Sequence, residues 1–110
     1  MSIHNVAAQF AEEIKNSREY QDLKQAKMKI DLNPSLRNRV EGYKRKENAL
    51  FVSASSSKDV NSKTAELNKL LEELAKTPDI SRFLKAEKDF NVFLQKTFKI
   101  ISDALDSGLK

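Results

Sequence analysis

The segment that follows Pro78 sets the strongest limit on the fold. From Thr77 to Leu109 the chain has no glycine until Gly108 and no proline after Pro78. Apolar residues recur there at helical spacing, which predicts one long C-terminal helix. They fall on two adjacent stripes. The first stripe consists of Ile80, Leu84, Leu94, Phe98, Ile101 and Leu105, and the second of Phe83, Ala86, Phe90, Phe93, Ile100 and Ala104.

Two apolar stripes are more than a single covering surface requires. A helix that lies on one surface usually presents one apolar face of about 100° or somewhat more. In a chain of 110 residues, we expect one stripe to pack on the chain's own helices and the other on a second subunit. The sequence therefore predicts assembly as a dimer or higher oligomer. The predicted interface or core residues are Ile80, Phe83, Leu84, Phe90, Phe93, Leu94, Phe98 and Ile101.

Two polar residues, Glu87 and Asn91, interrupt the first stripe. Glu87 is expected to form an ion pair with a lysine or arginine of another helix, and an oligomer interface is a natural place for such a partner. Polar residues at such positions can specify the register and the number of subunits at some cost in stability. Both residues are therefore expected to influence which helices pack against the long helix and in which register.

Helix-start signals divide the rest of the chain. The spacing of apolar residues predicts a first helix over residues 3–16. Ser17 is a good N-cap for a second helix that carries apolar residues as far as Ile30, although it could also mark a kink in one bent helix. Asn33 followed by Pro34 predicts the start of a third helix, because proline at the first helical position loses no needed donor.

A serine-rich stretch separates the third and fourth helices. Residues 53–59 predict a flexible loop or the frayed end of the third helix. Asp59, Asn61 or Ser62 could cap the fourth helix. The last helix would start at Thr77 and Pro78, because this pair has the same cap-and-proline pattern as Asn33 and Pro34. Short connections favour antiparallel neighbours, so we expect the third and fourth helices to form a hairpin with the last helix packed back along them.

Composition supports an all-α fold. Charged residues make up 33% of the chain, with only 2 glycines and 2 prolines, which is typical of a helical protein with a solvated outer surface. A chain of 110 residues is long enough for one domain. We therefore expect a single domain over residues 1–110, built as a helical hairpin or bundle of about four to five helices with a long C-terminal helix.

The residue types that carry chemistry are scarce. The chain has no cysteine and one histidine, His4, so neither a thiolate nor a pair of histidines is present to hold a metal. Two glycines cannot build a phosphate-binding loop or a nucleophile elbow. Adjacent carboxylates such as Glu12 and Glu13, or Glu72 and Glu73, point in different directions on a helix. The sequence predicts no catalytic residue, cofactor or metal, and no enzyme.

Charge and hydropathy restrict the location of the protein and its partners. No run approaches 18 apolar residues, so no membrane contact is expected. The first five residues lack the basic and apolar segments of a signal peptide. A chain without cysteine fits the cytoplasm, which we take as the predicted location. The net charge of +4 comes from well-mixed acidic and basic residues, a pattern more typical of a helical surface than of a nucleic-acid site.

One basic cluster in the third helix supports an alternative function. It consists of Arg37, Arg39, Lys44, Arg45 and Lys46. This possible contact face could bind nucleic acid through phosphate charges. However, Glu41 and Glu47 interrupt it, and no exposed aromatic platform for bases is evident, since Tyr43 is expected on the apolar side. A solvated surface explains the cluster better than nucleic-acid binding does, and contact with an acidic partner protein is another ordinary use of such a face. The sequence therefore does not favour nucleic acid as a partner.

Three segments, in their order and spacing, resemble the YlbF/YheA/YmcA family of small helical regulators of Gram-positive bacteria. They are Ser17-Arg18-Glu19-Tyr20 with Leu23-Lys24-Gln25-Ala26, then Asn33-Pro34, and then Ile80-Ser81-Arg82-Phe83-Leu84-Lys85-Ala86-Glu87. The first is similar to the S-x-E-Y/F…K-x-A opening of that family, the second to its N/D-P/E turn, and the third to its I-x-x-Y/L-x-x-A-E segment. The resemblance covers nearly the whole chain.

The resemblance implies a cytoplasmic, all-helical protein that forms dimers or higher oligomers and has no enzymatic activity. Some family members act in competence, sporulation and biofilm control, in a complex with each other and with a third protein that influences an mRNA-processing ribonuclease. For this chain it implies a regulatory or adaptor protein that acts through self-association and protein–protein binding. Sister proteins of the family would be its further partners.

Overall fold

The computed structural model describes the backbone of residues 2–52 and 57–110, and the side chains of residues 2–52 and 61–110. The described backbone forms helices joined by short turns and contains no strand, which confirms the predicted all-α fold with a long C-terminal helix. The helices are α1 (Ile3–Lys15), α2 (Arg18–Asp31), α3 (Pro34–Val52), α4 (Ser57–Leu74) and α5 (Pro78–Gly108).

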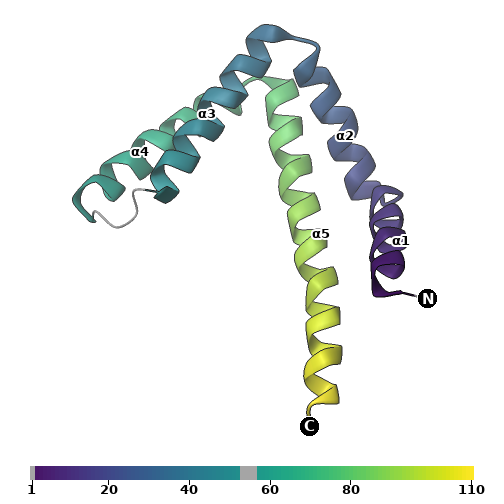
Figure 1. The fold of residues 1–110 in the computed structure, drawn as a ribbon. Coiled ribbons are helices and arrows are strands. Elements are labelled where there is room, and N and C mark those ends of the chain that lie inside the picture. Colours follow the sequence, from purple (N-terminus) through teal and green to yellow (C-terminus); the bar gives the residue numbers. More distant parts are fainter. Residues whose placement is uncertain (1, 53–56) are drawn as a thin grey trace.

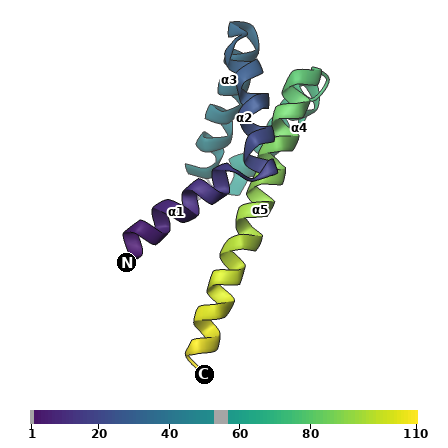
Figure 2. The ribbon, with the colours of Figure 1, turned by 90° about the vertical axis from the view of Figure 1, so that its right-hand side faces the viewer.

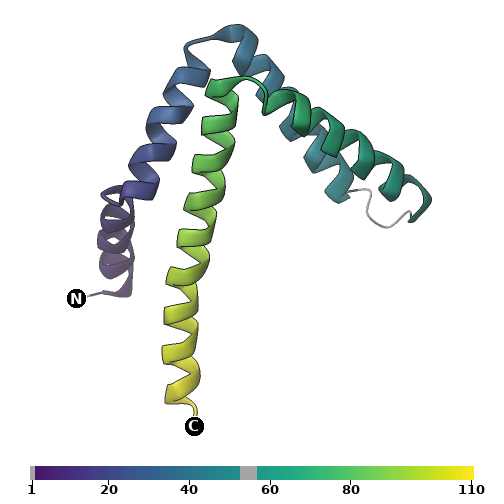
Figure 3. The same ribbon diagram turned by 180° about the vertical axis from the view of Figure 1, so that it is seen from behind.

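The helices are arranged as a V (Figure 1). One arm is the hairpin of α3 and α4, and the other consists of α2 packed along α5, with α1 continuing from the lower end of α2. The α2–α3 and α4–α5 turns meet at the vertex, as the view from behind also shows (Figure 3). The expected hairpin is therefore present. However, α5 lies along α2 rather than packing back along the hairpin, because its apolar residues near the vertex meet those of α2.

Two of the four predicted helix starts are capped as expected. The Ser17 hydroxyl accepts a hydrogen bond from the Tyr20 amide at 3.1 Å, and this cap separates α1 from α2 as distinct helices. The Asn33 side chain accepts from the amides of Ser35 and Leu36 at 3.1 and 3.3 Å. Each side chain satisfies amides that the first turn of a helix leaves without an intrahelical partner.

The other two starts differ from the prediction. Pro78 does begin α5, but the Thr77 hydroxyl makes no capping bond and instead accepts from the Arg39 guanidinium at 3.2 Å. Helix α4 begins at Ser57, so Asp59, Asn61 and Ser62 lie inside it and the proposed caps were wrong. Of the predicted loop over residues 53–59, residues 57–59 belong to α4 and residues 53–56 lie outside the described part.

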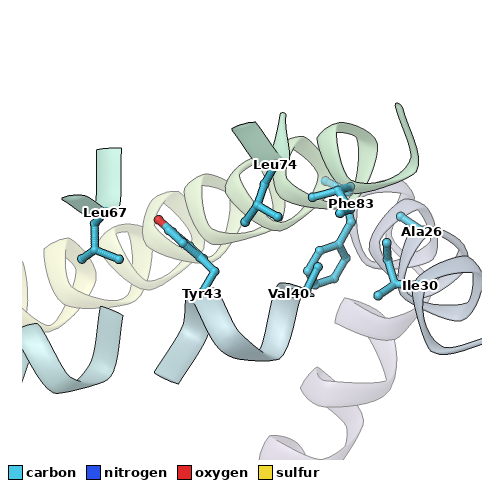
Figure 4. Close-up of a cluster of buried hydrophobic side chains, with 9 residues drawn as sticks. Ala26, Ile30, Val40, Tyr43, Leu67, Leu74 and Phe83 are labelled. Atoms are coloured by element: carbon cyan, nitrogen blue, oxygen red, sulfur yellow. The ribbon is translucent and has the colours of Figure 1, made fainter. Parts of the chain in front are cut away.

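The buried core begins at the vertex, where α2, α3, α4 and α5 come together, and continues between α3 and α4 (Figure 4). It consists of Ala26, Ile30, Val40, Tyr43, Leu67, Leu74, Ile80, Phe83 and Ala86. Leu74 and Ile80 are the most completely enclosed large side chains among the described residues. No described residue of α1, and none of α5 beyond Ala86, belongs to this core. The vertex therefore holds the arms together, while the lower part of the V has no buried core of its own.

We expect Leu74→Ala to lower the free energy of unfolding by about 2–5 kcal/mol, because it removes buried methyl groups and leaves a cavity at the vertex. Leu74 is only 2% exposed, whereas Leu32 is 82% exposed and provides the matched control. Leu32→Ala should change the same free energy by less than about 0.5 kcal/mol. Urea denaturation at one protein concentration measures both. Equal effects of the two substitutions would place the core elsewhere.

Candidate interaction surface

The first stripe of α5 is covered near the vertex and uncovered below it. Ile80 is buried, and Leu84 and Leu94 are half-buried. Farther along, Phe98, Ile101 and Leu105 are 52%, 43% and 67% exposed. The cover ends because the α3–α4 hairpin diverges from α5 (Figure 1). Of the residues predicted for an interface or core, those near the vertex therefore lie in the chain's own core and those farther down lie at the surface.

The second stripe faces α2 in its upper part. Ala86 is buried, and the ring of Phe90 meets the ring of Tyr20 edge-on, with 5.6 Å between the centroids. Phe93 stacks beside Phe90 and is half-buried, but Ile100 is exposed. Each of the two stripes thus has a partner within the chain near the vertex, and each loses it farther along the helix.

Helix α1 adds a second uncovered apolar face. Ile3 and Val6 are exposed, Phe10 and Ile14 are half-buried, and no residue of the helix is buried. In the side view, α1 diverges from the lower part of α5 (Figure 2). The sequence indicated that this helix is amphipathic, but it did not indicate that the apolar face would remain uncovered. We define the uncovered apolar surface as Ile3 and Val6 of α1 together with Phe98, Ile101 and Leu105 of α5.

The shape of the chain explains why so much apolar surface remains. The radius of gyration is 17.9 Å, whereas a compact domain of this length would have about 13 Å. The accessible surface is 8595 Å², against about 6,200 Å² for a compact monomer of the same mass. A standard protein interface covers about 800 Å² on each partner, which is well below this excess. The open V therefore has ample surface for a partner to cover.

The partner of Glu87 lies within the chain. Its carboxylate pairs with the Lys44 ammonium of α3, and both side chains are about one-third exposed or less. The predicted basic partner on another helix is therefore present, but it belongs to the same chain rather than to an oligomer interface. This ion pair links the two arms of the V just below the vertex and keeps the charge on the first stripe paired.

Tyr43 lies beside this ion pair and is buried. Its hydroxyl donates a hydrogen bond to the Glu47 carboxylate at 3.2 Å. Burial raises the pKa of Tyr43 above its usual value, and the negative charges of Glu47 and Glu87 and the hydrogen bond to Glu47 raise this pKa further. The ring therefore stays neutral and belongs to the core, as the sequence suggested, rather than forming an exposed platform for bases.

The structure divides the basic cluster of α3. Lys44 pairs with Glu87, and Arg39 donates to the Thr77 hydroxyl. Arg37 and Arg45 line an open groove of about 430 Å³ in the angle of the V, and no carboxylate among the described residues forms an ion pair with either. Lys46 is exposed. The cluster therefore consists of two arginines that line a groove and have no carboxylate partner among the described residues, and of three other cations, two of which have partners in the chain.

Little else in the described part of the chain is arranged for chemistry. The larger open groove, of about 730 Å³, lies between α2 and α5 and is lined mainly by charged side chains such as Arg18, Asp22 and Lys85. Among the described residues, no group of three or more histidine, aspartate or glutamate side chains is placed to hold a metal ion. His4 is exposed on α1. No helix in the described ranges is long and apolar enough to cross a membrane.

These features define a small all-helical protein whose most distinctive surface is apolar and suited to binding other helices. The chain belongs to the family described as "Control of competence regulator ComK, YlbF/YmcA", which it matches over residues 3–106. This match confirms the resemblance found in the sequence. The residues that carry the resemblance include Ser17, which caps α2, and Ile80, Phe83 and Ala86, which join α5 to the core.

Relatives in two bacteria match nearly the whole chain. A UPF0342 protein of Caldicellulosiruptor saccharolyticus is 28% identical over 106 residues, which is 96% of this chain and 88% of the relative. A UPF0342 protein of Caldicellulosiruptor bescii is 26% identical over 106 residues, which is 96% of this chain and 89% of the relative. Both matches cover most of each protein and are consistent with the family assignment.

A solved structure shares the fold. It is a chain in the crystal structure of Bacillus subtilis RicA in complex with RicF, which superposes with a TM-score of 0.65 over 98% of this chain and 96% of that chain. The two sequences are 15% identical, so the likeness concerns the fold. That structure contains two different proteins bound to each other.

We expect Tyr43→Phe to flatten the loss of stability at alkaline pH. The native state keeps the Tyr43 proton at pH values where the unfolded chain has lost it, so the unfolded state binds fewer protons and stability falls as the pH rises above about 10. Phenylalanine has no proton to lose. Urea denaturation at several pH values should show a steeper decline for the wild type than for the variant. Parallel declines would show that Tyr43 does not titrate differently in the two states.

Proposed function

We propose that this protein is a non-catalytic regulator or adaptor that acts through self-association and protein–protein binding. The observation that supports this proposal best is the uncovered apolar length of α5, where Phe98, Ile101 and Leu105 are exposed on one stripe. Burial of apolar area stabilises an association by roughly 25 cal/mol per Å², before the entropic cost of association is subtracted. Apolar patches of this kind on a small chain typically mark binding surfaces.

The family and its structures support a role in regulation. The description of the family refers to control of the competence regulator ComK. The structurally similar RicA was solved in complex with RicF. We therefore infer that this chain assembles with itself in a dimer or higher oligomer, and also with sister proteins of its family. Such complexes would act in the cytoplasm on competence, biofilm development or mRNA processing. The whole chain, residues 1–110, would act as one domain without a cofactor.

Nucleic-acid binding remains the second candidate function, because Arg37 and Arg45 line a groove without carboxylate partners among the described residues. Against it, Lys44 and Arg39 of the same helix already have partners within the chain. The remaining pair of charges would neutralise few phosphates. We therefore favour protein binding.

We expect Phe98→Asp to abolish self-association and leave the helix content unchanged, because Phe98 lies outside the buried core and a carboxylate cannot be buried there without a partner. Val92, which is exposed off the first stripe, supplies the control Val92→Asp and should remain associated. Size-exclusion chromatography with light scattering and circular dichroism would measure mass and helicity. A wild-type protein that is monomeric at micromolar concentration would contradict the proposal. Phe90→Asp should instead unfold the chain, because Phe90 packs on Tyr20.

Binding to generic RNA and DNA over a range of salt concentrations distinguishes the second candidate. If the chain acts through proteins alone, no binding is expected even at low salt. An affinity that falls steeply with salt and is weakened by Arg37→Gln with Arg45→Gln would instead support nucleic-acid binding. Lys76→Gln, at an exposed lysine outside the groove, is the matched control for nonspecific charge.

A further inference from the structure

We propose that α5 pairs antiparallel with α5 of a second copy of this chain, so that Leu94 faces Leu105 and Phe98 faces Ile101 across a two-fold axis. This proposal rests on the self-association proposed above and specifies how the two copies meet. Three independent observations favour a second copy rather than an unrelated protein as the partner of α5. They are the spacing of its apolar residues, the shape of the V and the distribution of charge on the helix.

The first reason is the spacing of the apolar residues along the lower part of the first stripe. Leu94, Phe98, Ile101 and Leu105 follow one another in steps of 4, 3 and 4 residues. This series reads the same in both directions, so an antiparallel copy places an apolar residue opposite each member. Together with Ile80 and Leu84 the series follows a seven-residue repeat, which is the pattern of helices that pack along a narrow apolar seam. We call these four residues the α5 seam.

The second reason is the shape of the V. The α5 seam continues the side of α5 that faces α3 at the vertex, where Glu87 pairs with Lys44 and where Phe83 and Val40 line the same groove. The α3–α4 hairpin therefore leaves α5 on the seam side (Figure 1). Two copies paired in parallel along the seam would bring both hairpins to the same end and into the same space. Antiparallel pairing places the hairpins at opposite ends.

The third reason is the distribution of charge around the seam. The positions that flank it are uncharged, namely Gln95, Thr97, Ser102 and Ala104. The charged residues between Leu94 and Leu105 lie on the side of α5 opposite the seam, namely Lys96, Lys99 and Asp103, and they are exposed. Lys99 and Asp103 pair with each other there at 2.9 Å. A second helix can therefore approach the seam without removing a charge from water.

The hydroxyl of Thr97, beside the seam, also permits a second helix to approach. It already donates a hydrogen bond to the Phe93 carbonyl at 2.8 Å within its own helix. A covering helix would therefore not leave this donor without a partner. In the proposed register, Thr97 lies beside the small Ala104 of the second copy and Gln95 lies beside its Ser102, so that no large side chain blocks the approach of the two helices.

Spin labels on the side of α5 opposite the seam test this arrangement, because the chain has no native cysteine to interfere. Asp89, Lys96 and Asp103 are exposed and spaced by one seven-residue repeat, so they point in nearly the same direction. Single variants Asp89→Cys, Lys96→Cys and Asp103→Cys would each carry one label, and pulsed electron spin resonance would measure the distance between the two copies. Light scattering on the same samples would establish whether they are dimeric.

We expect equal distances for the labels at residues 96 and 103, because they lie equally far from the two-fold axis. Along the helix axis the two labels would be about 10 Å apart at these positions and about 30 Å apart at residue 89, since each residue adds about 1.5 Å on each copy. Equal distances at all three positions would indicate parallel pairing and overturn the proposal. A dimer in which the distances at 96 and 103 differ would overturn the register while leaving self-association intact, whereas monomeric samples would contradict both proposals.

Discussion

The packing of α2 against α5 at the vertex is the contact on which the rest of the structure depends. Ala26 and Ile30 of α2 meet Ile80, Phe83 and Ala86 of α5 in one buried cluster that also receives α3 and α4. The two alanines allow the helices to approach closely, and the large apolar side chains fill the space between the arms. Because this cluster lies at one end of α5, it fixes the angle of the V and leaves the rest of the long helix outside the core.

This constraint divides α5 into an upper part that belongs to the core and a lower part whose apolar residues are exposed. Near the vertex, α5 is covered by its own chain, and the charge on its seam side is neutralised by the pair between Glu87 and Lys44. Below the vertex the same stripe continues as Phe98, Ile101 and Leu105 without cover. If the chain self-associates as proposed, a substitution in the upper part should act mainly on the stability of the fold, and one in the lower part mainly on association.

Local signals predicted much of the fold and little of its packing. The Ser17 cap and the Asn33 side chain at the start of α3 follow from residue chemistry within one turn of helix, and the structure contains both. The neighbour of α5 depends instead on the direction in which the chain leaves Pro78, and helical spacing does not encode that direction. The same limit applies to the candidate surface, because the two stripes revealed an excess of apolar residues but not the position along α5 at which the cover ends.

The two polar residues of the first stripe, Glu87 and Asn91, lie in different surroundings. Glu87 is paired with Lys44 of α3 within the chain, whereas Asn91, one turn farther along, is exposed. In the proposed antiparallel register, Asn91 lies opposite Gly108 of the second copy, so its polar side chain falls at the edge of the seam and keeps access to water. A longer apolar run would permit the two helices to slide past each other by a repeat, and the polar residues at 87 and 91 oppose such a shift.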